Sequence, residues 1–465
     1  MRRTTLLTAF AILLLVVGLI ADLAASPRRH PGLMRKPVPT AHRQTAGTPL
    51  TLTAALAGAR VLGQADGLTH LLVEVKAPES PNSVRPPLNV SLVIDRSGSM
   101  AGRKLRDAVE AARRFVEGLA DRDRVSLVIY DSTVDTLMPW TTLSEGRARV
   151  LSALSEVHER GGTNLGGGLI EGIRQARAGS TERTVNRVIL LSDGQANEGI
   201  TAPSALARIA AAASQHRVNV TTVGVGDDYN EDLMMLIASR GGGGYHYIRD
   251  SRALARLFSA ELKQLASTVG RNVRVEVELE PEVRLDEVYS VAHSRKRHGI
   301  TARLGDIFAG QTRKAIFRLA VPVDSTGFVD VARVVLRYDN ALADGKHMEA
   351  EVSVGMIVDP DPDAVAAAED RDVGEKVALV RTVIEMDRAV RVYERGDTKG
   401  AQRALAKAKD RAATRAAAYG SAALAGEAQR VESLVDDMEE SGHWDSQAGR
   451  HLRKASKASS WSAQQ

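Results

Sequence analysis

The sequence contains no cysteine, and this absence removes several functional classes at once. Without a thiol there is no disulfide framework, no cysteine nucleophile and no cysteine-ligated zinc or iron–sulfur centre. A lipid anchor attached to a processed cysteine is not expected for the same reason. Disulfides are not required at this length, because 465 residues can bury hydrophobic cores large enough for two or three domains.

Aromatic residues make up only 4% of the chain, and the net charge of +5 is small for its length. Sites for single-stranded nucleic acid stack bases on aromatic side chains, and nucleic-acid partners attract a concentrated positive charge. The composition therefore predicts no nucleic-acid partner. With 26% charged and 44% hydrophobic residues, it is typical of a soluble globular chain.

A long uncharged hydrophobic run occurs near the N-terminus, where Arg2 and Arg3 precede residues 4–21. A basic start followed by such a run is typical of an export signal. Its length is close to the roughly 20 apolar residues that cross a bilayer. Residues 1–25 are therefore predicted to be either a signal peptide or an N-terminal membrane anchor, followed by a disordered linker over 26–49. Both alternatives make the protein exported: periplasmic, membrane-anchored or secreted.

Residues 88–100, LNVSLVIDRSGSM, combine a hydrophobic strand with a run of oxygen-bearing side chains. The first half is a continuous apolar segment, as expected for a buried parallel strand. Asp95, Ser97 and Ser99 then follow the strand end at alternate positions. Ligands of open α/β sheets bind at the carboxyl ends of the strands, and oxygen donors suit a hard cation such as Mg²⁺. This stretch indicates a candidate metal site.

Two later stretches supply matching residues. Thr163 lies in the glycine-rich sequence GGTN before an apolar helix, and Asp193 ends a second buried strand. Together these positions resemble the metal-ion-dependent adhesion site of von Willebrand factor type A (VWA) domains: Asp95, Ser97, Ser99, Thr163 and Asp193. The resemblance covers residues 87–268 and is closest to bacterial secreted or membrane-anchored proteins. The alternative is that the two aspartates only cap strand-to-helix turns.

The resemblance implies a bound Mg²⁺, or Mn²⁺ or Ca²⁺ in its place. It implies that the serines and the threonine bind the ion directly or nearly so, and that the aspartates often act through water. A Glu or Asp of a protein partner then fills an open coordination position.

Alternating strands and helices over residues 87–268 predict an α/β fold, a doubly wound and mostly parallel sheet. A strand over 134–138 follows its predecessor too closely for a helical crossover and is expected to pair antiparallel at the edge. Acidic residues at 227–232 are interpreted as the start of a helix rather than a second metal site.

Beyond residue 268 the pattern changes to strands only, which predicts an accessory β-sandwich over 269–358. An alternating strand within residues 50–86 has no partner nearby and is expected to join it. Residues 359–440 are predicted to form a helical hairpin or bundle. The last segment, 441–465, is predicted to be a disordered basic tail containing Arg450, Arg453, Lys454 and Lys457.

The sequence contains no catalytic constellation. Ser97 or Ser99 with Asp193 lacks an activating histidine in a comparable motif, and residues 161–168 lack the Gly-Lys-Ser/Thr of a phosphate-binding loop. The protein is therefore predicted not to be an enzyme. The favoured function is an exported adhesion or assembly module whose divalent cation coordinates an acidic residue of a partner. The alternative is an envelope scaffold in which the metal is structural and the β-sandwich and helical arm recognise partners.

Overall fold

The computed structural model describes residues 42–464 except 80–84, 290, 298 and 442–445. The predicted signal peptide or membrane anchor, 1–25, and the predicted linker up to residue 41 lie outside the described residues. The end of that linker was predicted wrongly, because residues Arg43–Ala46 form a strand that pairs with Thr51–Leu56. Across the described ranges, no helix has both the length and the apolar character needed to cross a membrane.

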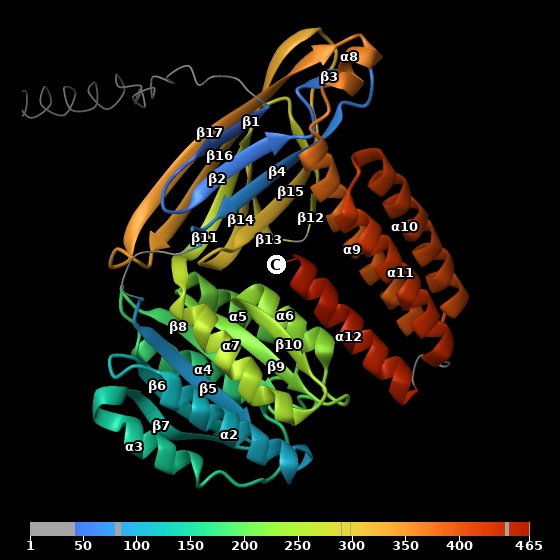
Figure 1. Cartoon of the computed structure of the whole chain (residues 1–465). Helices are drawn as coiled ribbons and strands as arrows, with labels where there is room; N and C mark the ends of the chain where they lie inside the picture. The colour runs from blue at the N-terminus through green and yellow to red at the C-terminus, as the bar shows by residue number, and fades with distance from the viewer. Residues whose placement is uncertain (1–41, 80–84, 290, 298, 442–445, 465) are drawn as a thin grey trace, which may run out of the picture. The chain divides into compact units, whose positions relative to one another are not determined.

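The central α/β domain contains a six-stranded sheet of order β10-β9-β8-β5-β6-β7 (Figure 1). Its strands are β5 (Leu88–Asp95), β6 (Arg124–Tyr130), β7 (Val134–Thr142), β8 (Val185–Ser192), β9 (Val218–Val225) and β10 (Gly242–Ile248). All neighbours pair in parallel except β6 and β7, which are antiparallel. Every residue of β5, β8 and β9 is buried, because helices cover both faces of the sheet.

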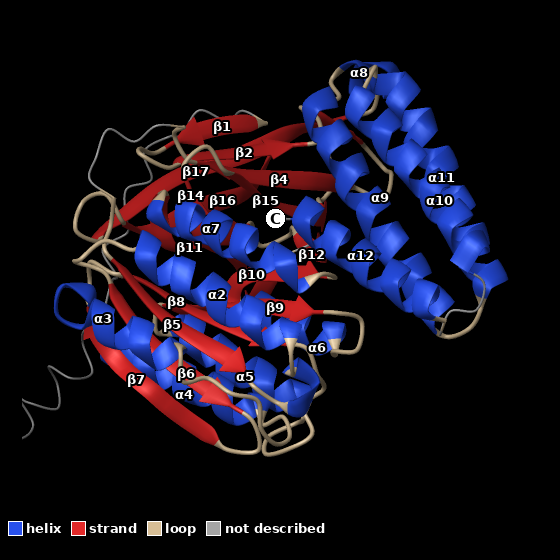
Figure 2. Ribbon diagram, turned by 60° about the horizontal axis from the view of Figure 1, so that its bottom comes forward, coloured by secondary structure: helices blue, strands red, loops and turns tan. Residues whose placement is uncertain are grey.

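Three helices pack on each face of this sheet (Figure 2). One face carries α2 (Arg103–Gly118), α3 (Leu143–Leu154) and α7 (Leu254–Ala266), and the other α4 (Leu165–Ala178), α5 (Pro203–Gln215) and α6 (Glu231–Gly241). The predicted doubly wound sheet is confirmed. The strand order reverses beside β5, since β6 continues on one side and β8 on the other. Such a switch point opens a crevice at the carboxyl end of the strands.

The β-sandwich consists of two sheets that share one hydrophobic core. The five-stranded sheet has the order β1-β2-β4-β15-β12, and the six-stranded sheet β13-β14-β11-β16-β17-β3. The strands before the α/β domain are β1 (Arg43–Ala46), β2 (Thr51–Leu56), β3 (Arg60–Leu62) and β4 (Leu68–Lys76). Those after it are β11 (Thr268–Leu279), β12 (Arg284–Tyr289), β13 (Ala292–Lys296), β14 (Gly299–Phe308), β15 (Thr312–Ala320), β16 (Gly327–Asn340) and β17 (Lys346–Asp359).

Strand β4 contains the segment that lacked a partner in the sequence, and it pairs with β15, far along the chain. The α/β domain is consequently inserted between β4 and β11 of the sandwich. Alternation along these strands places one side of each in the core: Val73 and Phe317, for example, are fully buried.

The sandwich meets the α/β domain at the amino-terminal edge of the parallel strands. Arg187, near the start of β8, forms a buried ion pair with Asp306 of β14, with Nη2 and Oδ2 3.0 Å apart. The Arg271 guanidinium of β11 donates to the backbone carbonyls of Thr184 and Glu182. The carboxyl ends of the strands therefore lie on the edge away from these contacts.

Helices complete the chain: α8 (Pro362–Ala367), α9 (Arg371–Glu394), α10 (Thr398–Tyr419), α11 (Ala422–Ser441) and α12 (Gln447–Gln464). Apolar residues of α9, α10 and α11 share a core of their own. The first turns of α9 also pack on the five-stranded sheet, where Val373 and Val377 contact Leu72 and Ile316.

The C-terminal segment differs from the prediction, because most of the expected disordered tail is helix α12. Lys454 and Lys457 are only 2% and 3% exposed. Lys454 Nζ lies 2.6 Å from Glu231 Oε2 and 4.1 Å from the centre of the Tyr229 ring. Lys457 Nζ lies 2.8 Å from Asp232 Oδ1. These anionic partners, more than 200 residues away in the sequence, pair with the buried lysines and hold the basic helix in place.

Candidate metal centre

The hydroxyl and carboxylate residues predicted from the sequence converge at the carboxyl edge of β5 and β8. Ser97 Oγ lies 3.1 Å from Ser99 Oγ, and Ser99 Oγ donates to Asp193 Oδ1 over 2.7 Å. A Cβ atom at Gly194 would lie 3.3 Å from Ser99 Oγ and 3.5 Å from Thr163 Oγ1. The three hydroxyls and Asp193 therefore border one small space, which the glycine leaves free of a side chain.

Asp95, the last residue of β5, is buried at the bottom of this site. Its side chain is inaccessible to solvent, and it accepts hydrogen bonds from Ser97 N and Ser192 Oγ, both over 2.9 Å. Burial raises the pKa of Asp95 to about 6, against the hydrogen bonds from the two serines, and the neighbouring Asp193 adds to the rise. A cation bound here would favour the charged form of Asp95 and so offset part of the cost of burying it.

Lys104, in the first turn of α2, places its ammonium group on Asp193. Its Nζ contacts Asp193 Oδ2 and also donates to the backbone oxygen of Ser99 over 3.3 Å. The Asp193 side chain is fully buried, whereas that of Lys104 is 33% exposed. The lysine thus provides a positive charge at the carboxylate where a metal ion is predicted. The sequence reasoning missed this residue, although it lies only five residues after Ser99.

Thr163 is fixed in position by the loop that precedes α4. Its N–H donates to Asn197 Oδ1 over 2.9 Å, and its carbonyl accepts from Asn197 N over 3.2 Å. The carbonyl of Gly161, a residue with φ of +71°, accepts a hydrogen bond from Gly98 N over 3.1 Å. This bond connects the loop to residues 96–99, the serine loop, which carries Ser97 and Ser99. Asn164 caps α4 by accepting from Gly167 N. The threonine hydroxyl is therefore held toward the serines.

A second ion pair, between Arg96 and Asp131, stabilises the serine loop on the side away from the site. Arg96 Nε donates to Asp131 Oδ2 over 2.6 Å, and the carbonyl of Arg96 accepts from Arg160 N over 2.8 Å. Burial acts to raise the pKa of Asp131, but hydrogen bonds from Thr133 and Arg96 outweigh it and hold this pKa below its ordinary value. Asp131 therefore stays ionised and keeps Arg96 turned away from the candidate metal site.

The donor set fits a hard divalent cation. It provides two carboxylates and three hydroxyls, and oxygen donors of this kind are the ligands that Mg²⁺, Mn²⁺ and Ca²⁺ accept. Among the residues that the structure describes, no cluster of three or more His, Cys, Asp or Glu side chains could hold a metal ion. A site in this domain therefore depends on hydroxyl ligands.

The acidic residues at 227–232 have another role. Asn230 caps α6 by accepting from Leu233 N, and Glu231 and Asp232 lie in the first turn of the helix. Both carboxylates also pair with lysines of α12. This agrees with their interpretation as a helix start, to which the structure adds a docking contact that the sequence did not reveal.

Residues 89–260 match the von Willebrand factor type A domain family. The chain therefore contains a VWA domain. The resemblance noted in the sequence is confirmed as far as the presence of this domain is concerned. VWA domains are protein-interaction modules, generally without enzymatic activity.

Relatives extend the match beyond this domain. Uncharacterized protein sll0103 of Synechocystis sp. is 30% identical over 282 residues, which cover 58% of this chain and 66% of that protein. Uncharacterized protein YfbK of Escherichia coli is 27% identical over 54% of this chain and 45% of its own length. Human inter-alpha-trypsin inhibitor heavy chain H3 is 32% identical over 34% of this chain and 18% of its own length. The chain thus spans no more than about two thirds of these relatives.

Two solved structures share the fold over most of the chain. The von Willebrand factor type A protein from Catenulispora acidiphila aligns with a TM-score of 0.68 at 18% identity, covering 87% of this chain and 91% of that one. The ArnB paralog VWA2 from Sulfolobus acidocaldarius aligns with a TM-score of 0.59 at 17% identity, covering 90% and 99%. At this identity the likeness concerns the fold alone.

Proposed function

We propose that Asp95, Ser97, Ser99, Thr163 and Asp193 hold one Mg²⁺ ion, which Mn²⁺ or Ca²⁺ can replace, and that the VWA domain uses it to bind a protein partner outside the cytoplasm. In this proposal a Glu or Asp of the partner completes the coordination of the ion. The observation that carries the proposal is the convergence of three hydroxyls and Asp193 around Gly194, above the buried Asp95.

Burial and exposure of the ligands support binding from one side. Asp95, Ser97, Thr163 and Asp193 are buried, whereas Ser99 and the adjacent Gly98 are exposed. An ion in this position would be enclosed by the domain below and accessible above. Two carboxylates do no more than balance its formal charge, and the hydroxyls are neutral, so the ion stays attractive to a further carboxylate. The contacts with the sandwich lie at the opposite edge of the sheet.

The metal-binding part of the proposal is tested by thermal unfolding of the purified chain with Mg²⁺, Mn²⁺, Ca²⁺ or EDTA. A ligand that binds only the folded state stabilises it, and above Kd the stabilisation grows with the logarithm of the ligand concentration. The expected result is a metal-dependent rise that disappears in Asp95→Ala. Asp121→Ala serves as the control, because Asp121 is 79% exposed and pairs with Arg147, away from the site. An equal rise in wild type and Asp95→Ala would contradict the proposed ligands.

The partner-binding part is tested by capture on the immobilised chain in Mg²⁺ and in EDTA. We expect a partner that is retained only in Mg²⁺, is not retained by Asp95→Ala, and loses binding when one of its own acidic residues is replaced. Retention that is indifferent to EDTA but lost on deleting residues after 359 would instead favour the scaffold function. The internal contacts of α9 with the sandwich and of α12 with the VWA domain give the helices a role within the chain, which favours the metal-dependent function.

A further inference from the structure

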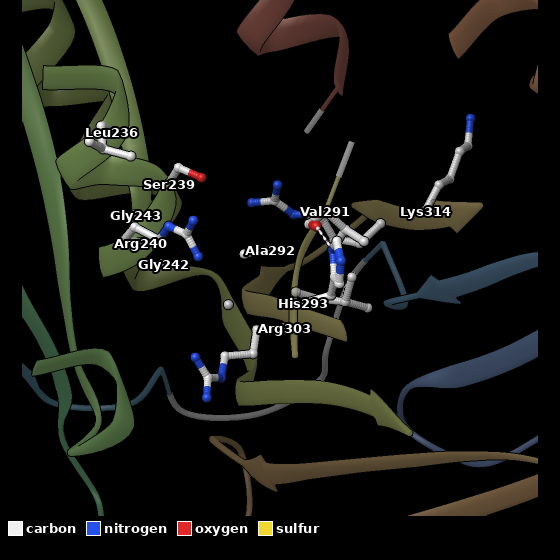
Figure 3. A pocket seen from close by; sticks show the side chains of 13 residues that line it. Leu236, Ser239, Arg240, Gly242, Gly243, Val291, Ala292, His293, Arg303 and Lys314 are labelled. Atoms are coloured by element: carbon white, nitrogen blue, oxygen red, sulfur yellow. Dashed lines mark hydrogen bonds between the residues drawn. The ribbon is translucent and has the colours of Figure 1, made fainter. Parts of the chain in front are cut away.

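A pocket of about 490 Å³ lies between the VWA domain and the sandwich (Figure 3). The end of α6 and the start of β10 form one wall, and residues of β13, β14 and β15 form the other. This volume is within the range that small-molecule sites occupy. The pocket lies at the amino-terminal edge of the sheet, so it is separate from the candidate metal centre.

The described lining of this pocket is cationic and contains no Asp or Glu. It includes Arg240 from the VWA domain and Arg303, Arg313 and Lys314 from the sandwich, together with His293. Figure 3 shows that the Arg240 side chain extends from the VWA domain and the Arg303 side chain from the sandwich. Like charges gathered in a partly enclosed space repel one another unless an anion compensates them.

None of these four Arg and Lys side chains has a hydrogen-bond or ion-pair partner among the described residues, whereas most arginines of the two domains do. The Nε atom of Arg313 is buried without a hydrogen-bond partner. Burial, with a further contribution from Arg187, lowers the pKa of Arg313 to about 10, although the nearby Asp306, which pairs with Arg187, acts to raise it. Arg313 therefore remains charged at neutral pH, with its Nε–H unsatisfied.

Two glycines with positive φ lie where the two domains meet beside this pocket. Gly242 ends α6 with φ of +69°, and Gly305 in β14 has φ of +73°. A Cβ atom at Gly305 would lie 2.8 Å from the carbonyl oxygen of Gly242. The two domains thus touch through glycine backbone, and the arginines reach the space from either side of this contact.

We infer that this pocket binds a small molecule that carries at least two anionic groups, phosphate or carboxylate. The guanidinium fork donates two parallel hydrogen bonds to such groups, and the four cations provide more positive charge than one anionic group neutralises. Because Arg240 and Arg303 belong to different domains, the bound anion would connect the VWA domain to the sandwich. This inference is independent of the metal centre.

The test is isothermal titration calorimetry of the purified chain with pyrophosphate and with citrate, at constant ionic strength. Both probes chelate divalent ions, so the titrations use metal-free buffer. We expect saturable binding of one ion per chain, and the probe that binds more tightly identifies phosphate or carboxylate as the preferred group. Asp95→Ala should bind the probe as the wild type does, which separates this pocket from the metal centre.

Variants locate the binding. Arg303→Gln and Arg240→Gln replace exposed side chains without described partners, so each is expected to fold normally and to weaken binding tenfold or more. Arg208→Gln, an exposed position on α5 outside the pocket, is the matched control and should bind with unchanged affinity. The inference is overturned if neither probe binds saturably at millimolar concentration, or if both pocket variants bind as tightly as Arg208→Gln.

Discussion

Replacing Lys104 is predicted to strengthen metal binding. In the structure its ammonium group contacts Asp193 and Ser99, so an incoming divalent ion has to take over the Asp193 carboxylate from it. The lysine side chain is 33% exposed, which reduces the net value of this charged hydrogen bond to about 1 kcal/mol. A Lys104→Met variant no longer loses this contact when the ion binds. Because about 1.4 kcal/mol corresponds to a tenfold change, its Mg²⁺ affinity should rise about fivefold.

Calorimetric titration with Mg²⁺ measures this effect directly, and thermal unfolding provides a second measurement. The metal-free form of Lys104→Met should unfold at a lower temperature than wild type, since Asp193 has lost its cation, and the stabilisation by Mg²⁺ should be larger. Lys104→Arg, which keeps the charge, is the control and should remain close to wild type. Unchanged or weaker Mg²⁺ binding by Lys104→Met would refute competition between the lysine and the ion.

Two further predictions concern groups buried away from the metal centre. Burial, together with Arg381 and Arg318, lowers the pKa of His70 to about 4. The unfolded chain takes up this proton near pH 6.5 and the folded chain only near pH 4, so between these values stability should fall by about 3 kcal/mol as pH falls. Urea unfolding across this range should show that His70→Gln lacks this component, and an identical pH dependence would contradict the reasoning. For α12, Lys457→Met removes the cation that faces Asp232 and Glu394. Faster amide hydrogen exchange over residues 447–464 is expected, compared with the exposed Lys407→Met, and equal protection would show that the ion pairs do not hold the helix.

Local patterns in the sequence were sufficient for the central domain and for the candidate ligands. The strand that ends at Asp95 is hydrophobic throughout because both of its faces are covered, and the oxygen donors follow it directly. Parallel strands end at a common edge, so residues after two strands could be expected to meet. Lys104 was missed because a lysine at the start of a helix is usually solvated. Nothing in the local sequence indicates that it pairs with Asp193, 89 residues away.

Contacts between distant segments were not predictable in the same way. The Arg187–Asp306 pair joins residues 119 positions apart, and Lys454 meets Glu231 across 223 positions. A single sequence shows neither pairing, and a basic segment without apolar periodicity has the pattern of a solvated tail. The arginine-lined pocket was not predictable for the same reason, since its two walls come from domains whose packing no local pattern specifies.

The insertion of the VWA domain between β4 and β11 determines how mechanical load would pass through the protein. The chain enters β5 at the sandwich end, whereas Asp95 lies at the opposite end of the same strand. A pull applied at that residue therefore runs lengthwise along β5, which is hydrogen-bonded to β6 and β8 along nearly its whole length. Because both points of load lie on one strand, the covalent backbone of β5 carries the tension, and its hydrogen bonds to β6 and β8 are not opened one after another. A load applied at the candidate metal centre would therefore reach the sandwich along a single strand.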